Sequence, residues 1–522
     1  MTALSSSRLR TPPALRRWQQ PLGVLLLSSL AAILRFYYIA HQSYWGDEDV
    51  TVWLLHHSLG QTLHLVPTKE ASPPLYYVIA WVWTRIFGLG EAGTRSLSAV
   101  CGIALVPVMY LTARKLFSSP RTALIAAGLT AFNPLLIWYS QETRPYEMLV
   151  LATAVSFLAF AYVREAPRPL LLGAWAVSCM VAFAVHYYAV LTIVPQAALL
   201  LYGHRRNRAV WVAVALVGVC LAVLTPLLLH EDQTLPLKYF EMWSLGYRIT
   251  QTPTLFLTGT GSPAHDLLKW LAYAALLGTL VLLWRRGSRL QQGAALTMSG
   301  IAAAAFLMSL AFVMVGQDSF LARNLMGASV PAALLVVGGL DAARARRAGA
   351  GLTAVFCAIG MASALGLDHS YVNQKPDWQA VARALGPHPS ALAPAGSRRL
   401  IVTKHNGGIL GIPQLAPYMH GLTFKAPRWS RDIGEVDVIL VRRLPGQGRL
   451  CWWGAACNLM PSAGQSTFPL AGFHVAGTLT VKQFTIVRLV ASRPRSVNRG
   501  RLARMLHERH WGPARNMLII QR

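Results

Sequence analysis

Long apolar runs separated by short polar segments dominate the first 367 residues. A helix needs about 20 apolar residues to cross roughly 30 Å of hydrocarbon. Eleven runs have this character, and we expect each to form a membrane-spanning helix: 21–40, 96–116, 121–139, 147–163, 170–186, 188–203, 209–229, 266–284, 292–315, 325–340 and 350–367. The pattern predicts an α-helical polytopic membrane protein with a transmembrane domain over residues 21–367.

One further apolar run, at 73–88, is shorter and begins with Pro73 and Pro74. Counting it as a span would place every later arginine cluster on the outer side. We therefore interpret it as an interfacial or re-entrant helix within a long first outer loop, residues 41–95. A second long outer loop is expected at 230–265.

The composition changes after Asp368, where no later run is long enough to span. Residues 378–385 have helical spacing, and β-branched runs occur at 400–403, 436–441 and 484–487. The sequence thus predicts a small soluble α/β domain over residues 368–522.

Two cysteines of this domain, Cys451 and Cys457, are close enough in sequence to close a small loop in an oxidising compartment, and a disulfide between them stays open. The other four cysteines stand singly in apolar runs, where they are expected to be small core residues.

Composition and charge agree with this organisation. The chain has 54% hydrophobic and 13% charged residues, with a mean hydropathy of +0.41. Its net charge of +28 resides in short arginine clusters between apolar runs, which argues against nucleic-acid binding and fits cytoplasmic loops. The basic residues 1–20 then place the N-terminus in the cytoplasm and the C-terminal domain outside. Because no small-residue cleavage site follows the first run, we expect a retained anchor in the plasma (inner) membrane.

Charged residues gather on the predicted outer face. Asp47, Glu48 and Asp49 follow the first span, and Arg95 ends the first loop. The other members of this set are Lys69, Glu142, Arg144 and Arg323. Each taken singly is explained by a helix end, a snorkelling side chain or a local ion pair. Their joint occurrence in turns flanked by aromatic residues such as Tyr146 favours a catalytic or binding site.

An ordered set of motifs within residues 30–380 resembles a known family. The set comprises Arg35, Trp45-Gly46-Asp47-Glu48, Pro73-Pro74-Leu75-Tyr76-Tyr77, Gly90-Glu91, Arg95-Ser96-Leu97-Ser98, Asn133-Pro134, Tyr139-Ser140-Gln141-Glu142-Thr143-Arg144-Pro145-Tyr146 and Lys375-Pro376-Asp377-Trp378. It is similar to bacterial members of the GT-C glycosyltransferases, in the branch of the protein O-mannosyltransferases and the lipid A aminoarabinose transferases. The resemblance implies a GT-C fold.

The same resemblance implies an inverting transfer of a sugar from a polyprenyl-phosphate carrier to an acceptor hydroxyl outside the membrane. Asp47 would be the base, with Glu48 and Glu142 orienting it or binding sugar or acceptor. Arginines suit the departing phosphate, and the candidates are Arg95, Arg144 and Arg323, with Lys69 and Tyr146 as further binding residues. Mannose is the family-weighted sugar, and the acceptor is a glycan, a lipid or a protein.

No Gly-rich phosphate loop is visible, which suits a lipid-linked donor. No cofactor is required by the pattern, although clustered carboxylates can bind a divalent cation. The sequence departs from relatives at Ser72, where many carry a histidine, so a role of that histidine does not transfer. Two other classes stay open: a transporter, which would place charges at mid-membrane, and a non-catalytic envelope scaffold.

Overall fold

Helices form most of the chain, and a six-stranded sheet lies near its C-terminal end. The computed structural model describes residues 13–234, 243–262, 264–369, 374–404, 415–424, 427–441, 470–508 and 516–521. Cys451 and Cys457 lie outside these residues, so whether they form a disulfide stays open. Four free cysteines are described, at positions 101, 179, 220 and 357.

The chain divides into two units. The first contains Met1–Tyr37, Arg95–Pro226 and Ser244–Leu365, and the second contains Tyr38–Thr94, Leu227–Trp243 and Gly366–Arg522. Residues of the predicted first outer loop thus cluster with the C-terminal residues.

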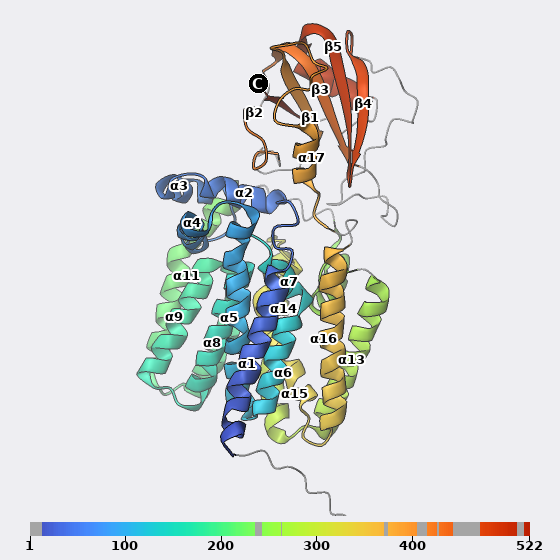
Figure 1. Ribbon diagram of the computed structural model, residues 1–522. Helices are drawn as coiled ribbons and strands as arrows, with labels where there is room; N and C mark the ends of the chain where they lie inside the picture. The colour runs from blue at the N-terminus through green and yellow to red at the C-terminus, as the bar shows by residue number, and fades with distance from the viewer. Residues whose placement is uncertain are drawn as a thin grey trace, which may run out of the picture. The chain divides into compact units, whose positions relative to one another are not determined.

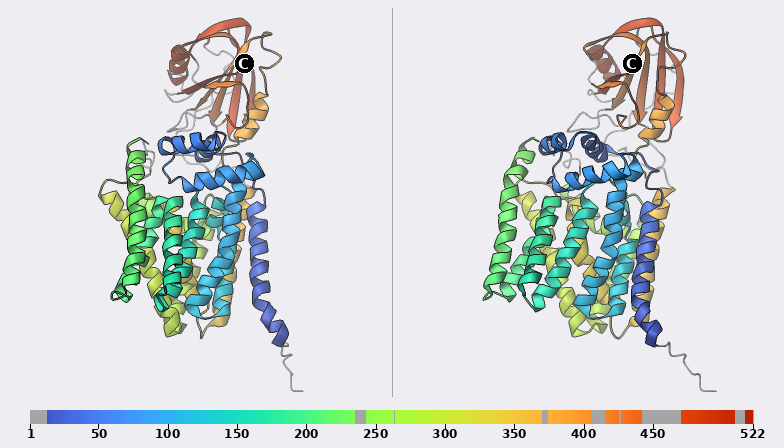
Figure 2. Two further views of the ribbon diagram at one scale, coloured as in Figure 1. Left: turned by 90° about the vertical axis from the view of Figure 1, so that its left-hand side faces the viewer. Right: turned by 60° about the vertical axis from the view of Figure 1, so that its left-hand side comes forward.

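Apolar helices running side by side build the first unit (Figures 1 and 2). In chain order they are α1 (Pro13–Phe36), α5 (Glu91–Phe117), α6 (Pro120–Phe132), α7 (Pro134–Ser140), α8 (Tyr146–Glu165), α9 (Pro169–Val185), η1 (Tyr187–Ala189), α10 (Val190–Gly203), α11 (Arg208–Thr234), α12 (Leu245–Thr258), α13 (His265–Arg286), α14 (Arg289–Met314), η3 (Ala322–Ala328), α15 (Ser329–Leu340) and α16 (Arg346–Asp368). A few of them extend past the limits of the unit.

Every predicted span overlaps a helix or consecutive helical segments, although the helix of the first span ends at Phe36 and not at residue 40. Within the described residues, seven helices are long and apolar enough to cross a membrane, and an eighth counts if α6 and α7 form one bent span. The remaining predicted spans correspond to shorter apolar helices, Gln20–Phe36, Pro169–Val185 and Tyr187–Gly203. The protein is therefore a multi-pass membrane protein with the predicted helical fold class.

The break between α6 and α7 has a local cause. Asn133 ends α6 in an extended conformation, and its side chain accepts a hydrogen bond from the amide of Leu136 (3.0 Å). Pro134 follows at the first helical position, where its missing N–H costs no hydrogen bond. The two helices are bent by 54°, and α7 then leads into the turn at 141–145.

Helices occur in both predicted outer loops. Residues 41–95 contain α2 (Gly46–Leu55), α3 (Leu59–Lys69) and α4 (Leu75–Phe87), whereas the sequence indicated only the last. Ser58 begins α3 with a capping box formed with Gln61. The second loop, 230–265, holds α12, whose polar residues Arg248, Thr252, Thr254 and Thr258 are buried.

The C-terminal residues form a mixed sheet with a helix on each face (Figure 2). The strands, in spatial order, are β2 (Leu422–Phe424), β6 (Asn516–Gln521), β1 (Arg398–Lys404), β3 (Trp429–Val441), β5 (Phe484–Asn498) and β4 (His474–Val481). Among the described strands, β1 and β3 are the one parallel pair. The predicted strands at 400–403, 436–441 and 484–487 lie in β1, β3 and β5, and the predicted helix at 378–385 is α17 (Trp378–Leu385).

Alternation along the strands separates the two cores. Ile401 and Ile439 face α17, whereas Leu400 and Val438 face the opposite side, where Leu502 of α18 (Arg499–Glu508) packs. This is the period of two expected for a strand buried on both faces.

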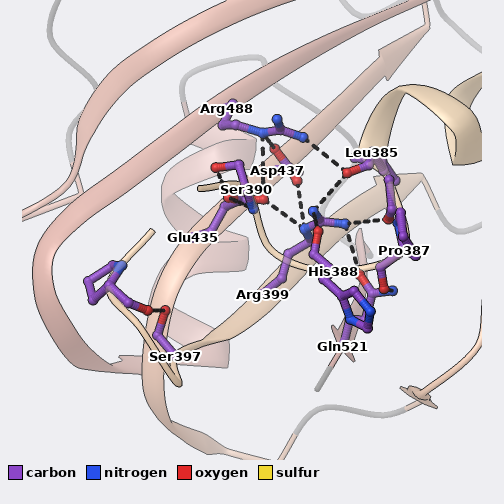
Figure 3. Close-up of polar contacts among 12 residues, drawn as sticks. Leu385, Pro387, His388, Ser390, Ser397, Arg399, Glu435, Asp437, Arg488 and Gln521 are labelled. Atoms are coloured by element: carbon purple, nitrogen blue, oxygen red, sulfur yellow. Dashed lines mark hydrogen bonds and ion pairs between the residues drawn. The ribbon is translucent and has the colours of Figure 1, made fainter. Parts of the chain in front are cut away.

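A buried ionic network joins the sheet to the end of α17 (Figure 3). Nε of Arg399 lies 2.7 Å from Glu435 and 3.2 Å from Asp437, and Arg488 lies 2.9 Å from Asp437. Arg399 also donates a hydrogen bond to the carbonyl of Leu385 (2.7 Å), which lies at the end of α17 and has no acceptor role within the helix itself. The network thus both pairs buried charges and caps a helix.

Candidate active site

The acidic segment of the second unit forms the first turn of α2. Trp45 is extended and the helix starts at Gly46, so Asp47, Glu48 and Asp49 all lie at its positive end, where carboxylates are favoured. Asp47 is half-buried, whereas Glu48 and Asp49 are buried. Of the three carboxylates, Asp47 is the most exposed to an incoming molecule.

Glu48 forms an ion pair with a lysine that sequence reasoning left without a role. Nζ of Lys375 lies 3.0 Å from Oε2 of Glu48, and both side chains are buried. The Lys375 ammonium also lies 6.0 Å from the ring centroid of Trp45. The signal that could have identified this residue was its place in the Lys375-Pro376-Asp377-Trp378 motif.

The residues before α2 are held by the C-terminal segment of the same unit. Oγ of Ser43 donates to Asp377 (3.0 Å) and accepts from the amide of Gln379 (2.9 Å). The amide of Tyr44 donates to the hydroxyl of Tyr418 (2.7 Å). Residues 43 and 44 are thereby fixed by groups more than 330 positions later in the chain.

Asp377, which accepts the hydrogen bond from Ser43, carries a charge. Burial raises the pKa of its carboxyl, but hydrogen bonds from Lys482, the amide of Ala380 and Ser43 outweigh that effect, so the pKa lies below its ordinary value. Asp377 is therefore an anion at neutral pH, and it also caps the start of α17.

Lys69 is the last residue of α3 and is half-buried. Its side chain forms no ion pair or hydrogen bond with the described residues of its unit, so no contact supports its predicted role. Its neighbour Glu70 is buried and accepts a hydrogen bond from Thr51 of α2 (2.8 Å). This contact fixes the end of α3 against α2.

The first unit contains the other predicted site residues. Glu142, Arg144 and Tyr146, in and just after the turn between α7 and α8, are all buried. The guanidinium of Arg144 lies 5.9 Å from the ring centroid of Tyr146, and its carbonyl accepts a hydrogen bond from Ser98 of α5 (3.3 Å). Arg95 lies one turn before Ser98 and is buried as well.

His186, which the sequence analysis did not single out, links two of the predicted cations. Its ring lies 5.6 Å from that of Tyr146, and the guanidinium groups of Arg144 and Arg323 both act electrostatically on it. Arg323 is half-buried in η3. The structure therefore brings Arg144, Tyr146 and Arg323 around one buried imidazole.

An arginine of α12 fixes the segment that leads into η3. Arg248 forms a bidentate pair with Asp318, with N–O distances of 2.7 and 2.6 Å, and donates to the carbonyl of Phe320 (2.8 Å). The hydrogen bond from Arg248 lowers the pKa of Asp318 below its ordinary value. Arg323 follows three residues after Phe320, so this contact anchors the start of its segment.

A metal centre is not indicated in the described parts of the chain. There, no group of three or more His, Cys, Asp or Glu side chains is placed to hold a metal ion.

Comparison with known proteins gives one family match. Residues 71–230 match the family model described as dolichyl-phosphate-mannose-protein mannosyltransferase. The resemblance to GT-C glycosyltransferases is confirmed over this stretch. The match includes Arg95, Glu142, Arg144, Tyr146 and His186, and it ends before Arg323. A search among curated proteins gave no match.

Solved GT-C structures show a distant likeness. ArnT from Cupriavidus metallidurans in the apo state is 17% identical over 71% of this chain and 70% of its own, with a TM-score of 0.44. The same protein bound to undecaprenyl phosphate is 15% identical over 63% of this chain and 62% of its own, with a TM-score of 0.42. The S. cerevisiae Pmt1–Pmt2 complex bound to the sugar donor is 16% identical over 41% of this chain and 34% of its own, with a TM-score of 0.31. The latter two alignments span less than two thirds of the known protein, and these scores are too low to assign a substrate.

Proposed function

We propose that this GT-C-type chain is an inverting glycosyltransferase that moves a monosaccharide from a polyprenyl-phosphate donor to an acceptor hydroxyl on the extracytoplasmic side of the membrane. The observation that carries the proposal is the match of residues 71–230 to a family that uses dolichyl-phosphate mannose, a polyprenyl-phosphate sugar. Mannose is accordingly the first sugar to test. Glycans, lipids and proteins remain the candidate acceptors.

Asp47 is the proposed general base. The acceptor oxygen attacks the anomeric carbon from the side opposite the phosphate while the carboxylate of Asp47 takes the hydroxyl proton. The bond between the anomeric carbon and the phosphate oxygen breaks, and the lipid phosphate leaves with the bonding electrons. Support comes from the half-buried position of Asp47 beside Glu48, whose charge is already paired with Lys375.

Arginines of the first unit are the proposed phosphate-binding groups. A departing phosphate gains negative charge, and a planar guanidinium matches its oxygens in a bidentate manner. Arg144 and Arg323 are supported by their common neighbour His186, and Arg95 by its burial near the residue that binds the Arg144 carbonyl. Glu48 and Glu142 are proposed to orient Asp47 or to bind sugar or acceptor hydroxyls. Of the residues proposed to bind substrate, Lys69 has the least support from the structure.

The orientation follows from the positive loops. With the N-terminus in the cytoplasm, the acidic segment and the C-terminal domain face outward, where a lipid-linked sugar is presented. The proposal places the protein in the plasma membrane.

The test compares donor classes. Membranes carrying the chain, and matched membranes lacking it, are given radiolabelled sugars either as polyprenyl phosphates or as nucleotide sugars, with carrier synthesis blocked. Transfer into lipid, glycan or protein fractions from the lipid-linked donor alone is the expected result. Transfer from the nucleotide sugar alone would contradict the proposal. No transfer from any donor by a folded protein would favour a transporter or a scaffold.

A further inference from the structure

Three consecutive carboxylates at the start of α2 pose an electrostatic problem. Asp47, Glu48 and Asp49 lie within one helical turn, and two of them are buried. The positive end of a short helix offsets only part of this charge. A buried carboxylate is strongly disfavoured unless a cation or several hydrogen bonds compensate it.

Lys375 supplies such a cation to Glu48. The side chains of Lys375 and Glu48 are 3% and 0% exposed, and their charged atoms are 3.0 Å apart. At this burial the pair is far less screened by solvent than a surface ion pair. The contribution of this ion pair to the stability of α2 therefore depends on both Lys375 and Glu48 being present.

The backbone of Lys375 is fixed on the same segment. Its amide donates to Oε1 of Gln42 (3.0 Å), and Gln42 is buried. Two residues further on, Asp377 binds Ser43 (3.0 Å) and Lys482. Lys375 is thus positioned from the residues that immediately precede α2, so its ammonium meets Glu48 in a defined geometry.

We infer that Lys375 is a positioning residue of the candidate active site. Its ammonium compensates Glu48 and so fixes the first turn of α2, which carries Asp47. Its role in sugar transfer rests on the proposed function, whereas its hold on α2 does not. No part of this role requires Lys375 to touch the donor or the acceptor.

The first test measures the order of α2 without reference to activity. Hydrogen exchange of the full chain in detergent is followed in peptides that cover residues 43–55. Lys375→Met removes the ammonium that lies 3.0 Å from the buried Glu48 carboxylate, and we expect exchange there to become about tenfold faster. Adding Glu48→Gln removes the buried negative charge that Lys375 no longer compensates and should return exchange toward the native rate. Lys375→Arg, which keeps the charge, should lie between native and Lys375→Met.

A matched control removes a charge from the same unit. Arg398 forms a partly exposed pair with Asp432 at 3.4 Å, so Arg398→Met should leave exchange of residues 43–55 unchanged. Native exchange in Lys375→Met would overturn the inference. So would exchange in the double variant that stays as fast as in Lys375→Met.

The second test separates positioning from donor binding. With an active donor, Lys375→Met should lower kcat by about tenfold to a hundredfold while the KM for the donor stays within about twofold. Lys375→Arg should recover part of kcat. A raised KM with unchanged kcat would overturn the inference by making Lys375 a donor-binding group.

The two proposals can fail separately. If the native chain transfers no sugar from any donor, the proposed function is wrong, and the exchange measurements still decide whether Lys375 holds α2. If transfer occurs and the exchange pattern is absent, only the positioning role is wrong.

Discussion

Nε of Arg35 donates a hydrogen bond to Oγ of Ser140 over 3.1 Å and joins two residues 105 positions apart. The same guanidinium donates to the carbonyls of Thr130 (3.1 Å) and Ala131 (3.0 Å) near the end of α6. Next to Ser140, Gln141 donates to the carbonyl of Tyr37 (2.8 Å). The end of α1 therefore holds the turn that leads to Glu142 and Arg144.

Space for this contact depends on Gly102 of α5. A methyl group added there would overlap with Oγ of Ser140 and Nε of Arg35. We predict that Gly102→Ala destabilises the first unit by about 1–3 kcal/mol, as overpacking of a buried site does. Thermal unfolding of the purified protein in detergent measures the effect.

Gly128 of α6 provides the matched control. It is also buried and helical, but a methyl group added there would meet nothing within 4 Å. Because alanine is the better helix former, Gly128→Ala should be neutral or slightly stabilising. Equal unfolding temperatures for the two variants would contradict the account of the Arg35 contact.

Arg144 should be sensitive even to a conservative change. Lysine keeps the charge but loses the planar, two-pronged donor set. We predict that Arg144→Lys lowers transfer by about tenfold and Arg144→Gln by about 10²–10³-fold. Steady-state transfer measures this, with Arg289→Gln, an exposed arginine at the start of α14, as the control. Full activity of Arg144→Gln would remove Arg144 from the proposed site.

Anchoring of η3 by Arg248 can be tested by exchange. Arg248→Lys cannot keep both hydrogen bonds to Asp318 together with the one to Phe320 in the same geometry. We expect faster hydrogen exchange in peptides covering residues 315–328 and unchanged exchange in α14 before residue 310. If residues 315–328 exchange as in the native chain, the contact does not order the segment.

The buried network of the C-terminal sheet should make that domain pH-dependent. Burial, together with the charge of Glu435, raises the pKa of Asp437 to about 7 against the attraction of Arg488 and Arg399. Because the folded pKa exceeds the ordinary 3.8, this residue's contribution is full below about pH 3.8 and is lost as pH rises through 7. The pKa of Glu435 is lowered from its ordinary 4.5. The contribution of Glu435 to stability is therefore lost only as pH falls below about 4.5, and not as pH rises through 7.

The sheet should therefore become less protected as pH rises from about 5 to 8. Asp437→Asn should remove most of this dependence. The measurement is hydrogen exchange of peptides from β3 in the native chain relative to Asp437→Asn at each pH, which cancels the intrinsic pH effect on exchange. Asp432→Asn, which changes an exposed carboxylate on the same strand, should leave the trend intact. A native-to-variant ratio that is constant across this range would contradict the assignment.

Much of the helical fold could be predicted because apolar length and arginine clusters both report on the membrane. Each predicted span overlaps helices, and the short run at 73–88 forms the separate helix α4. The helices α2 and α3 were not predicted, since polar residues such as Asp47 and His64 interrupt their apolar pattern. The strand β2 was also missed, because its partner β6 lies far away in sequence. The strand β4 was missed although it forms a hairpin with β5, because most of its residues are exposed and give no alternating apolar pattern.

Candidate site residues could be found where charge interrupts an apolar pattern, as at Asp47 and Arg144. Their partners could not, because a pair such as Glu48 and Lys375 spans 327 positions and depends on tertiary folding. His186 was missed since a single histidine between two apolar runs carries no distinctive signal. Arg35 and Glu147 show a further limit: both are wholly buried within the first unit, and the apolar pattern around a charged residue does not tell whether its side chain is buried.

The role of Asp47 as base is the central chemical claim, and one measurement tests it most directly. Purified native protein and Asp47→Asn, with folding confirmed by matching unfolding temperatures, are compared in a single turnover with a radiolabelled polyprenyl-phosphate sugar and an envelope acceptor fraction. Asparagine keeps the shape of the side chain but cannot take a proton, so transfer should slow by about 10²–10⁴-fold while the donor still binds. Equal rates for the two proteins would contradict the claim and exclude Asp47 as the base.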